Sequence, residues 1–177
     1  GETALLYAVA GGHGPVVSAL LDVGADANST ARNGQTPLMA AAQRGEASLV
    51  ESLLKHDAHS DAVDAAGRSA LWYAADNGDA DSIKALTAGH ANGLLADREG
   101  YTPLARAAQQ GHAAAVDVLL RYGGDIDHLT RQGNSPLLLA ADGGYTAVLK
   151  RLLASGANVD IRNERGNTAL MLAAAGG

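Results

Sequence analysis

Small, polar and apolar residues follow one pattern that returns every 33 residues along the chain. Each copy reads Gly, a variable residue, Thr or Ser, Pro or Ala, and then Leu, followed by further small and apolar positions. The copies open at Gly1, Gly34, Gly67, Gly100, Gly133 and Gly166. A fixed period of this length is the signature of a repeat architecture, in which one structural unit is stacked several times. The chain is therefore predicted to be an array of similar units.

The opening of each unit predicts a short helix. A Thr or Ser can cap the helix N-terminus, and a Pro at the first helical position loses no hydrogen bond there. The expected caps are Thr36, Ser69, Thr102, Ser135 and Thr168, and the prolines are Pro37, Pro103 and Pro136. Paired Ala residues give the helix a narrow side that a neighbour can approach. Left-handed glycines are expected to end it at Gly45, Gly78, Gly111 and Gly144.

A second helix is predicted in each unit by apolar residues spaced three to four apart. Examples are Val116, Leu119 and Leu120, and Val148, Leu152 and Leu153. Glycines such as Gly24, Gly123 and Gly156 close it, and a polar segment rich in Asp and Asn leads to the next unit. Helices shorter than about 12 residues are marginal in water without tertiary packing. Each unit is therefore expected to bury its apolar side against its neighbours, as in a solenoid.

The repeated pattern resembles the ankyrin repeat, most fully over residues 100–125, which read GYTPLARAAQQGHAAAVDVLLRYGGD. The resemblance implies an all-α solenoid of stacked helix-turn-helix units with projecting β-hairpin-like fingers. It implies one domain over residues 1–177, with repeat frames 1–33, 34–66, 67–99, 100–132 and 133–165 and a partial frame 166–177. Because both ends interrupt a repeat and the chain opens without Met, we expect a fragment of a longer array.

Two units depart from this pattern. Asp57 and His90 stand where a glycine closes the second helix in other units, and a positive φ there costs a non-glycine residue free energy. The third unit places Thr87 where a second Leu is expected, and Leu94 and Leu95 in the polar finger. We expect a distorted or re-registered finger in that unit.

Composition narrows the possible functions. With 47% hydrophobic and 18% charged residues the chain is a folded protein, and with 3% aromatic residues its core must consist of Ala, Leu and Val. A net charge of −6 argues against general nucleic-acid binding. The absence of Cys excludes disulfides and thiolate sites. No apolar run is long enough for a membrane span and no signal peptide is visible, so we leave the compartment open and favour the cytoplasm and a monomer.

The sequence offers no catalytic constellation. His13 and His112 directly follow a turn glycine and are interpreted as packing residues. A metal could in principle bind in the cluster His56, Asp57, His59 and Asp61, although a solvated turn is favoured. No phosphate-binding loop and no nucleophile elbow is present, so we expect no enzyme activity, no cofactor and no metal.

The remaining candidate is the surface. Ankyrin repeats usually bind partners with finger residues and the exposed side of the first helix. The resemblance therefore implies the partner-binding set Arg32, Gln35, Gln43, Arg44, Arg68, Asp76, Arg98, Tyr101, Gln109, Gln110, Arg131, Asn134, Asp142 and Arg165. Six of the chain's ten arginines are in this set, and Arg and Tyr are favoured at interfaces. Arg106 occupies a position that is apolar or small in most units, so it either reaches the surface or pairs with a carboxylate.

We interpret the chain as a protein-interaction module whose concave groove holds an extended or helical peptide with some acidic character. In a less specific interpretation the face is only polar, with Arg32, Arg98 and Arg131 paired to acidic neighbours such as Asp64, Asp97 and Glu99. An alternative function is a scaffold segment of a larger enzyme, channel or bacterial effector whose active domain lies outside this chain. A third hypothesis, binding of a small ligand or nucleotide, has no motif to support it.

Overall fold

The computed structural model describes residues 3–176, and within them the chain forms two rows of short helices. The first helices of the units are α1 (Ala4–Ala10), α3 (Pro37–Arg44), α5 (Ala70–Asn77), α7 (Pro103–Gln109), α9 (Pro136–Asp142) and α11 (Ala169–Gly176). The second helices are α2 (Gly14–Asp22), α4 (Ala47–Lys55), α6 (Ala80–Ala88), α8 (Ala113–Arg121) and α10 (Thr146–Ala154). Each helix of the first five units packs against its partner in the same unit, and all the helices pack against counterparts in adjacent units, which is the all-α solenoid that the sequence predicts.

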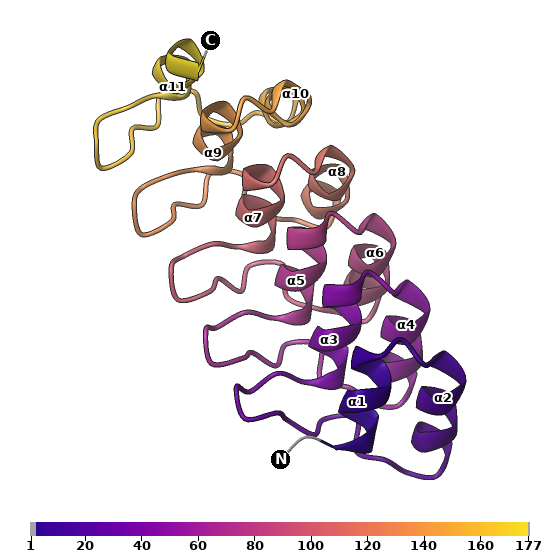
Figure 1. Cartoon of the computed structure of the whole chain (residues 1–177). Coiled ribbons are helices and arrows are strands. Elements are labelled where there is room, and N and C mark those ends of the chain that lie inside the picture. Colours follow the sequence, from indigo (N-terminus) through magenta and orange to yellow (C-terminus); the bar gives the residue numbers. More distant parts are fainter. Residues whose placement is uncertain (1–2, 177) are drawn as a thin grey trace.

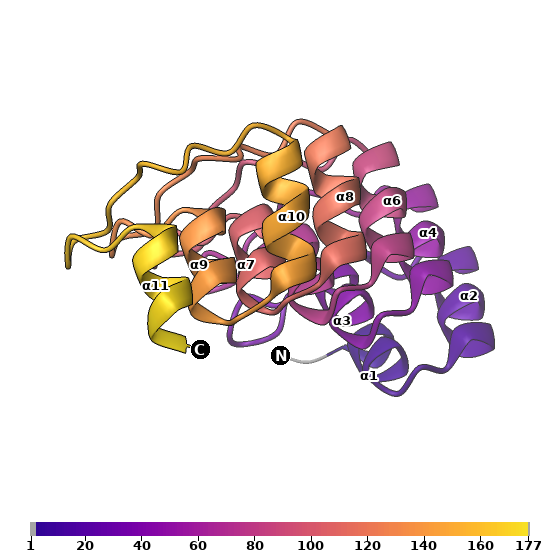
Figure 2. The same cartoon turned by 90° about the horizontal axis from the view of Figure 1, so that it is seen from above.

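Long connections, here called fingers, project to one side of the two rows, so that each unit has the shape of an L (Figure 1). The five fingers span residues 23–36, 56–69, 89–102, 122–135 and 155–168. Seen from above, the first helices lie between the fingers and the second helices (Figure 2). The surface formed by the fingers and the first helices is therefore continuous along the stack.

The predicted caps form as expected. Thr36, Ser69, Thr102 and Ser135 each accept a hydrogen bond from the backbone N–H three residues later, at 3.2 to 3.3 Å. The turn glycines predicted to be left-handed all have positive φ. Asp57 and His90 also have positive φ, 60° and 62°, so these two units adopt the same turn at a conformational cost that glycine avoids.

Neighbouring fingers are joined near their tips by one backbone hydrogen bond at each of four junctions. The N–H of Ala65 donates to the Asn33 carbonyl at 2.9 Å, Arg98 to Ala66 at 2.9 Å, Arg131 to Glu99 at 3.0 Å, and Glu164 to Gln132 at 3.1 Å. At Gly100, which has a φ of +86°, an added Cβ would lie 2.9 Å from the Arg131 nitrogen. The opening glycine of that unit is thus required both by its backbone conformation and by the adjacent finger.

The prediction of a distorted finger in the third unit is wrong. Residues 89–102 make the same tip hydrogen bonds as the other fingers, including Asp97 N–H to the Tyr101 carbonyl at 3.1 Å. The misplaced Thr87 satisfies its hydroxyl within α6 by donating to the Ile83 carbonyl at 2.8 Å. Leu94 remains 54% exposed. Backbone pairing fixes the finger, and an apolar side chain on its surface does not disturb that pairing.

The core consists mainly of Ala, Leu and Val, as the composition predicts. The paired alanines of the first helices are fully buried: Ala41, Ala42, Ala74, Ala75, Ala107 and Ala108. Because these side chains are small, adjacent first helices approach closely. Two rings, Trp72 and Tyr73, join this core where the first helix of the third unit faces the fingers.

Candidate binding surface

Two clefts open between the fingers and the first helices. One, of about 540 Å³, lies between the second and third fingers and is lined by side chains that include Asp64, Arg68, Trp72, Arg98 and Arg106. The other, of about 450 Å³, lies along α9 and the fifth finger. Tyr101 lines both clefts, so the two clefts are neighbours along the stack.

Asp64 organises the floor of the larger cleft. Its side chain is only 2% exposed, and its carboxylate accepts hydrogen bonds from the backbone N–H groups of Ala66 and Arg68 at 2.8 and 2.9 Å. The Arg68 guanidinium donates to the same carboxylate through Nε at 2.9 Å and Nη2 at 2.8 Å. The Tyr73 hydroxyl donates to it at 2.7 Å. A buried carboxylate with this many donors fixes the second finger to α5.

These contacts shift the pKa values of Asp64, Arg68 and Tyr73. Burial by itself would raise the pKa of Asp64, but hydrogen bonds from the Arg68 N–H, the Tyr73 hydroxyl and the Arg68 guanidinium lower it below its ordinary value. Burial and the hydrogen bond to Asp64 raise the pKa of Tyr73. Burial would lower the pKa of Arg68, but the bond to Asp64 raises it. The carboxylate is therefore charged at neutral pH and the phenol is neutral.

The Trp72 ring lies close to the guanidinium groups of two arginines. The guanidinium carbon of Arg106 lies 4.8 Å from the centroid of the Trp72 ring, and that of Arg68 lies 5.5 Å from it. Arg68 is also 5.0 Å from the Tyr73 ring, which meets Trp72 edge to face with centroids 5.4 Å apart. At these distances the ring quadrupoles attract the guanidinium groups. Trp72 is 4% exposed, so the ring holds both arginines in place from below the cleft.

A second ion pair joins α5 to α7. The Arg106 Nε donates to the Asp76 carboxylate at 2.7 Å, and the Gln110 amide donates to the same oxygen at 2.8 Å. Arg106 also donates to the Gln109 side chain at 2.6 Å, and Gln109 donates to the Tyr101 hydroxyl at 3.3 Å. The sequence left open whether Arg106 pairs with a carboxylate, and in the structure it pairs with Asp76.

Five of the fourteen predicted residues meet in this network: Arg68, Asp76, Tyr101, Gln109 and Gln110. Tyr101 is only 9% exposed and packs with Ala105 and Leu139, so it supports the groove more than it protrudes into it.

Other predicted residues lie in two places and do not join these hydrogen bonds. At the N-terminal end Gln35 donates to Gln43 at 2.8 Å, and Arg44 donates to Glu46 at 2.6 Å and to the Ala10 carbonyl at 2.8 Å. Asn134, Asp142 and Arg165 line the smaller cleft at the other end. The predicted set therefore runs along the whole face.

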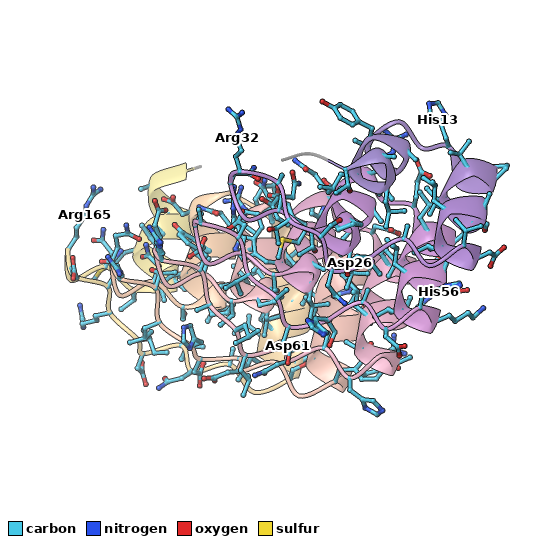
Figure 3. The ribbon with its side chains drawn as sticks, turned by 90° about the horizontal axis from the view of Figure 1, so that it is seen from below. His13, Asp26, Arg32, His56, Asp61 and Arg165 are labelled. Atoms are coloured by element: carbon cyan, nitrogen blue, oxygen red, sulfur yellow. The ribbon has the colours of Figure 1, made fainter. Side chains whose placement is uncertain are left out.

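The predicted arginines of the finger tips have exposed side chains. Figure 3 shows Arg32 and Arg165 pointing away from the stack at well-separated fingers. The less specific interpretation pairs Arg32, Arg98 and Arg131 with neighbouring carboxylates, but within residues 3–176 none of the three forms an ion pair. Asp64 pairs with Arg68 instead.

Sequence reasoning missed Asp64, Trp72 and Tyr73 as parts of the site. Trp72 is the only Trp of the chain, and it replaces a residue that is apolar and smaller in the other units. A position-by-position comparison of the units would have found Trp72, because it searches for the residue that differs most in size and charge from its equivalents.

Among the described residues, three of the six histidines have a partner for a ring nitrogen: His56, His112 and His128. A ring nitrogen of His112 lies 2.8 Å from the Asp76 carbonyl, in keeping with the predicted role in packing. At the residues that offered a metal site as an alternative, the backbone N–H of His59 donates to Asn28 Oδ1 at 2.7 Å, and Asp61 Oδ1 accepts from the backbone N–H of Asn92 at 2.7 Å. Nowhere in the described residues do three or more His, Asp or Glu side chains form a group that could hold a metal ion.

Comparison with known proteins agrees with the architecture. A model of ankyrin repeats, three copies to a match, fits residues 1–64, 47–130 and 115–177. A search of curated proteins finds no match to the chain. None of the helices in residues 3–176 is both long and apolar enough to cross a membrane. The matches and the stacked helix pairs show that the chain belongs to the ankyrin-repeat family, whose fold is a non-catalytic module for protein–protein interaction.

Proposed function

We propose that this protein binds a partner protein or peptide through the groove between its fingers and first helices. The observation that carries the proposal is a pair of neighbouring clefts that share Tyr101, with exposed arginines on the fingers beside them. A groove of this form accepts an extended or helical segment laid along the stack.

We further propose that the bound segment has some acidic character. Arg98 and Arg131 occupy the same position in neighbouring fingers, and neither guanidinium forms an ion pair with another residue of the described range 3–176. A partner carboxylate would find unoccupied donors there. Asp97 and Glu99 line the larger cleft, so recognition would rest on local pairing with individual arginines and not on a positive groove as a whole.

The repeat count belongs to the same proposal. We infer one domain over residues 1–177, with five full repeats in the frames given above and the start of a sixth at Gly166. One pair of helices per frame and a left-handed glycine at each described frame opening support this division. The binding groove would then span repeats two to five and involve the partner-binding residues named above.

The test is quantitative affinity capture with two charge-matched double variants. Arg98→Ala with Arg131→Ala removes two exposed finger guanidiniums, while Lys55→Ala with Lys150→Ala removes two exposed cations from second helices. We expect the finger variant to lose about tenfold or more in partner recovery, because each charge-assisted hydrogen bond contributes about 1.5 to 3 kcal/mol. The lysine variant should capture as the wild type does.

Equal recovery by the wild type and both variants would exclude these arginines as the contact. The alternative, in which the stack positions a domain lying outside this chain, would then be favoured. A circular dichroism melt of each variant shows whether the fold is retained, which we expect since none of the four side chains makes an ion pair.

A further inference from the structure

A ladder of side-chain hydrogen bonds runs along the base of the fingers, on the side where the chain leaves each second helix. Its acceptors occupy equivalent positions, and each takes a backbone N–H from the next finger. Asn28 accepts from His59 at 2.7 Å, Asp61 accepts from Asn92 at 2.7 Å, and Asp127 accepts from Asn158 at 3.0 Å. The equivalent residue of the third finger is Leu94, which has no acceptor, so the ladder has a gap there.

The gap coincides with exposed apolar side chains. Leu94 is 54% exposed, and Val63 and Leu129, two positions further along their own fingers, are each 48% exposed. Val63, Leu94 and Leu129, here called the back strip, are exposed apolar residues on the second, third and fourth fingers, which are consecutive in the stack. A place where a sequence omits a local stabilising bond and exposes a large apolar residue is a candidate for function.

Carboxylates surround the back strip. Asp61 and Asp127 hold the positions equivalent to Leu94 on the two adjacent fingers, and Asp125 precedes Asp127 by two residues. Asp26 and Asp160 extend the acidic border toward the ends of the stack. Figure 3 shows Asp26 and Asp61 on the connections that run from the second helices into the fingers. The border is negative, whereas the finger tips carry the exposed arginines.

We propose that the back strip docks a basic, leucine-bearing segment of a partner protein, independently of the groove. Leu94 supplies the apolar contact, and Asp61 and Asp127 attract lysine or arginine side chains on either side of it. An acidic border repels nucleic acid and anionic membranes, so a protein segment is the occupant that the charges favour. Packed helices lie about 8–10 Å apart, and residues seven apart in a helix are separated by about 10.5 Å. A helical segment laid across the fingers thus matches their spacing.

The probe is a synthetic helical peptide of about 18 residues, with leucines on one face and lysines flanking them, titrated by fluorescence anisotropy. A second peptide with glutamates in place of the lysines serves as its comparison. We expect saturable binding of the lysine peptide, which weakens as salt is raised, and binding of the glutamate peptide at least about tenfold weaker.

Two variants separate the apolar contribution from the charge. Leu94→Asn removes the leucine and provides a ladder acceptor, so it should keep the fold and weaken binding of the lysine peptide by about tenfold. Asp61→Asn with Asp127→Asn keeps both Oδ1 acceptors and removes two charges, so it should weaken binding and flatten its salt dependence. Val16→Asn is the matched control, since Val16 is 50% exposed on α2, and it should bind as the wild type does.

The proposal is overturned if the lysine peptide does not bind, if Leu94→Asn and Val16→Asn bind it equally, or if both peptides bind alike. The finger variant Arg98→Ala with Arg131→Ala should bind the lysine peptide normally. Loss of binding in that variant would place the peptide in the groove and refute the back strip, whereas failure of the back strip would leave the groove proposal untouched.

Discussion

The third and fourth units are joined in contrasting ways on their two sides. On the groove side, Asp76 at the end of α5 holds Arg106, Gln110 and a ring nitrogen of His112 within 2.7 to 2.8 Å. At the base of the fingers, the bond that other junctions make is missing because Leu94 replaces its acceptor. The junction between the third and fourth units therefore has additional polar contacts on the groove side and lacks one hydrogen bond at the base of the fingers.

The contrast shows where this chain departs from its own repeat. Backbone bonds at the finger tips are kept at all four junctions, since they need only the fold. Side-chain bonds vary from unit to unit, and their energetic weight depends on burial. Asp64 is 2% exposed and Asp76 is 27% exposed, whereas the ladder residues at the base are mostly exposed. Removal of a contact should cost most where the group left behind is buried.

The largest effect is expected for Asp64→Ala. It leaves the Tyr73 hydroxyl and the Arg68 guanidinium without their buried acceptor, and breaking a buried pair in this way costs about 3 kcal/mol or more. Urea denaturation at neutral pH measures the loss. A change below about 0.5 kcal/mol, the range of ordinary surface substitutions, would show that the groove side does not carry the stability assigned to it. Glu46→Ala, at the exposed pair with Arg44, is a comparison that should cost little.

Lowering the pH should remove the stability that the ionised Asp64 carboxylate contributes. Because the pKa of Asp64 is lower in the folded protein, its ionised form stabilises the fold at pH values above the ordinary aspartate pKa, about 3.9. That stability is lost as the pH falls through the folded value. The difference in unfolding free energy between the wild type and Asp64→Asn should therefore narrow when denaturation is repeated at progressively lower pH. A constant difference would mean that the carboxylate is not preferentially ionised in the fold.

An intermediate effect is expected for Asp76→Ala. The substitution removes the acceptor of Arg106 and Gln110 at a partly exposed site, with an expected cost of about 1 to 2 kcal/mol. Asp142 is its equivalent two units later and is exposed, with no side-chain hydrogen bond to the next unit among those of the described residues. Asp142→Ala should change the urea midpoint little. Equal losses in the two variants would show that the bond to Arg106 adds nothing to the junction.

Local chemistry made most of the fold predictable. Thr and Ser caps, prolines at the first helical position and left-handed glycines act within a few residues, so the sequence alone places them. The pair Arg106 and Asp76 spans 30 residues and depends on how neighbouring units superpose. In the alternative interpretation Arg98 could pair with a carboxylate such as Asp64, but Arg68 and Tyr73 already donate to that carboxylate. Competition of this kind for one buried acceptor is visible only in three dimensions.

The smallest effect is expected at the base, where Leu94→Asn should restore the missing ladder bond. The new side chain can accept the N–H of Asp125, as Asp61 accepts that of Asn92. A net gain of about 0.5 to 1 kcal/mol in unfolding free energy relative to Leu94→Ala is expected for one exposed hydrogen bond. Leu94→Asp should gain less, because Asp61 and Asp127 at the adjacent positions repel a third carboxylate, and that deficit should shrink in high salt. If Asn and Ala at position 94 gave the same urea midpoint, the ladder would contribute nothing to the junction, and the contrast between its two sides would rest on the groove alone.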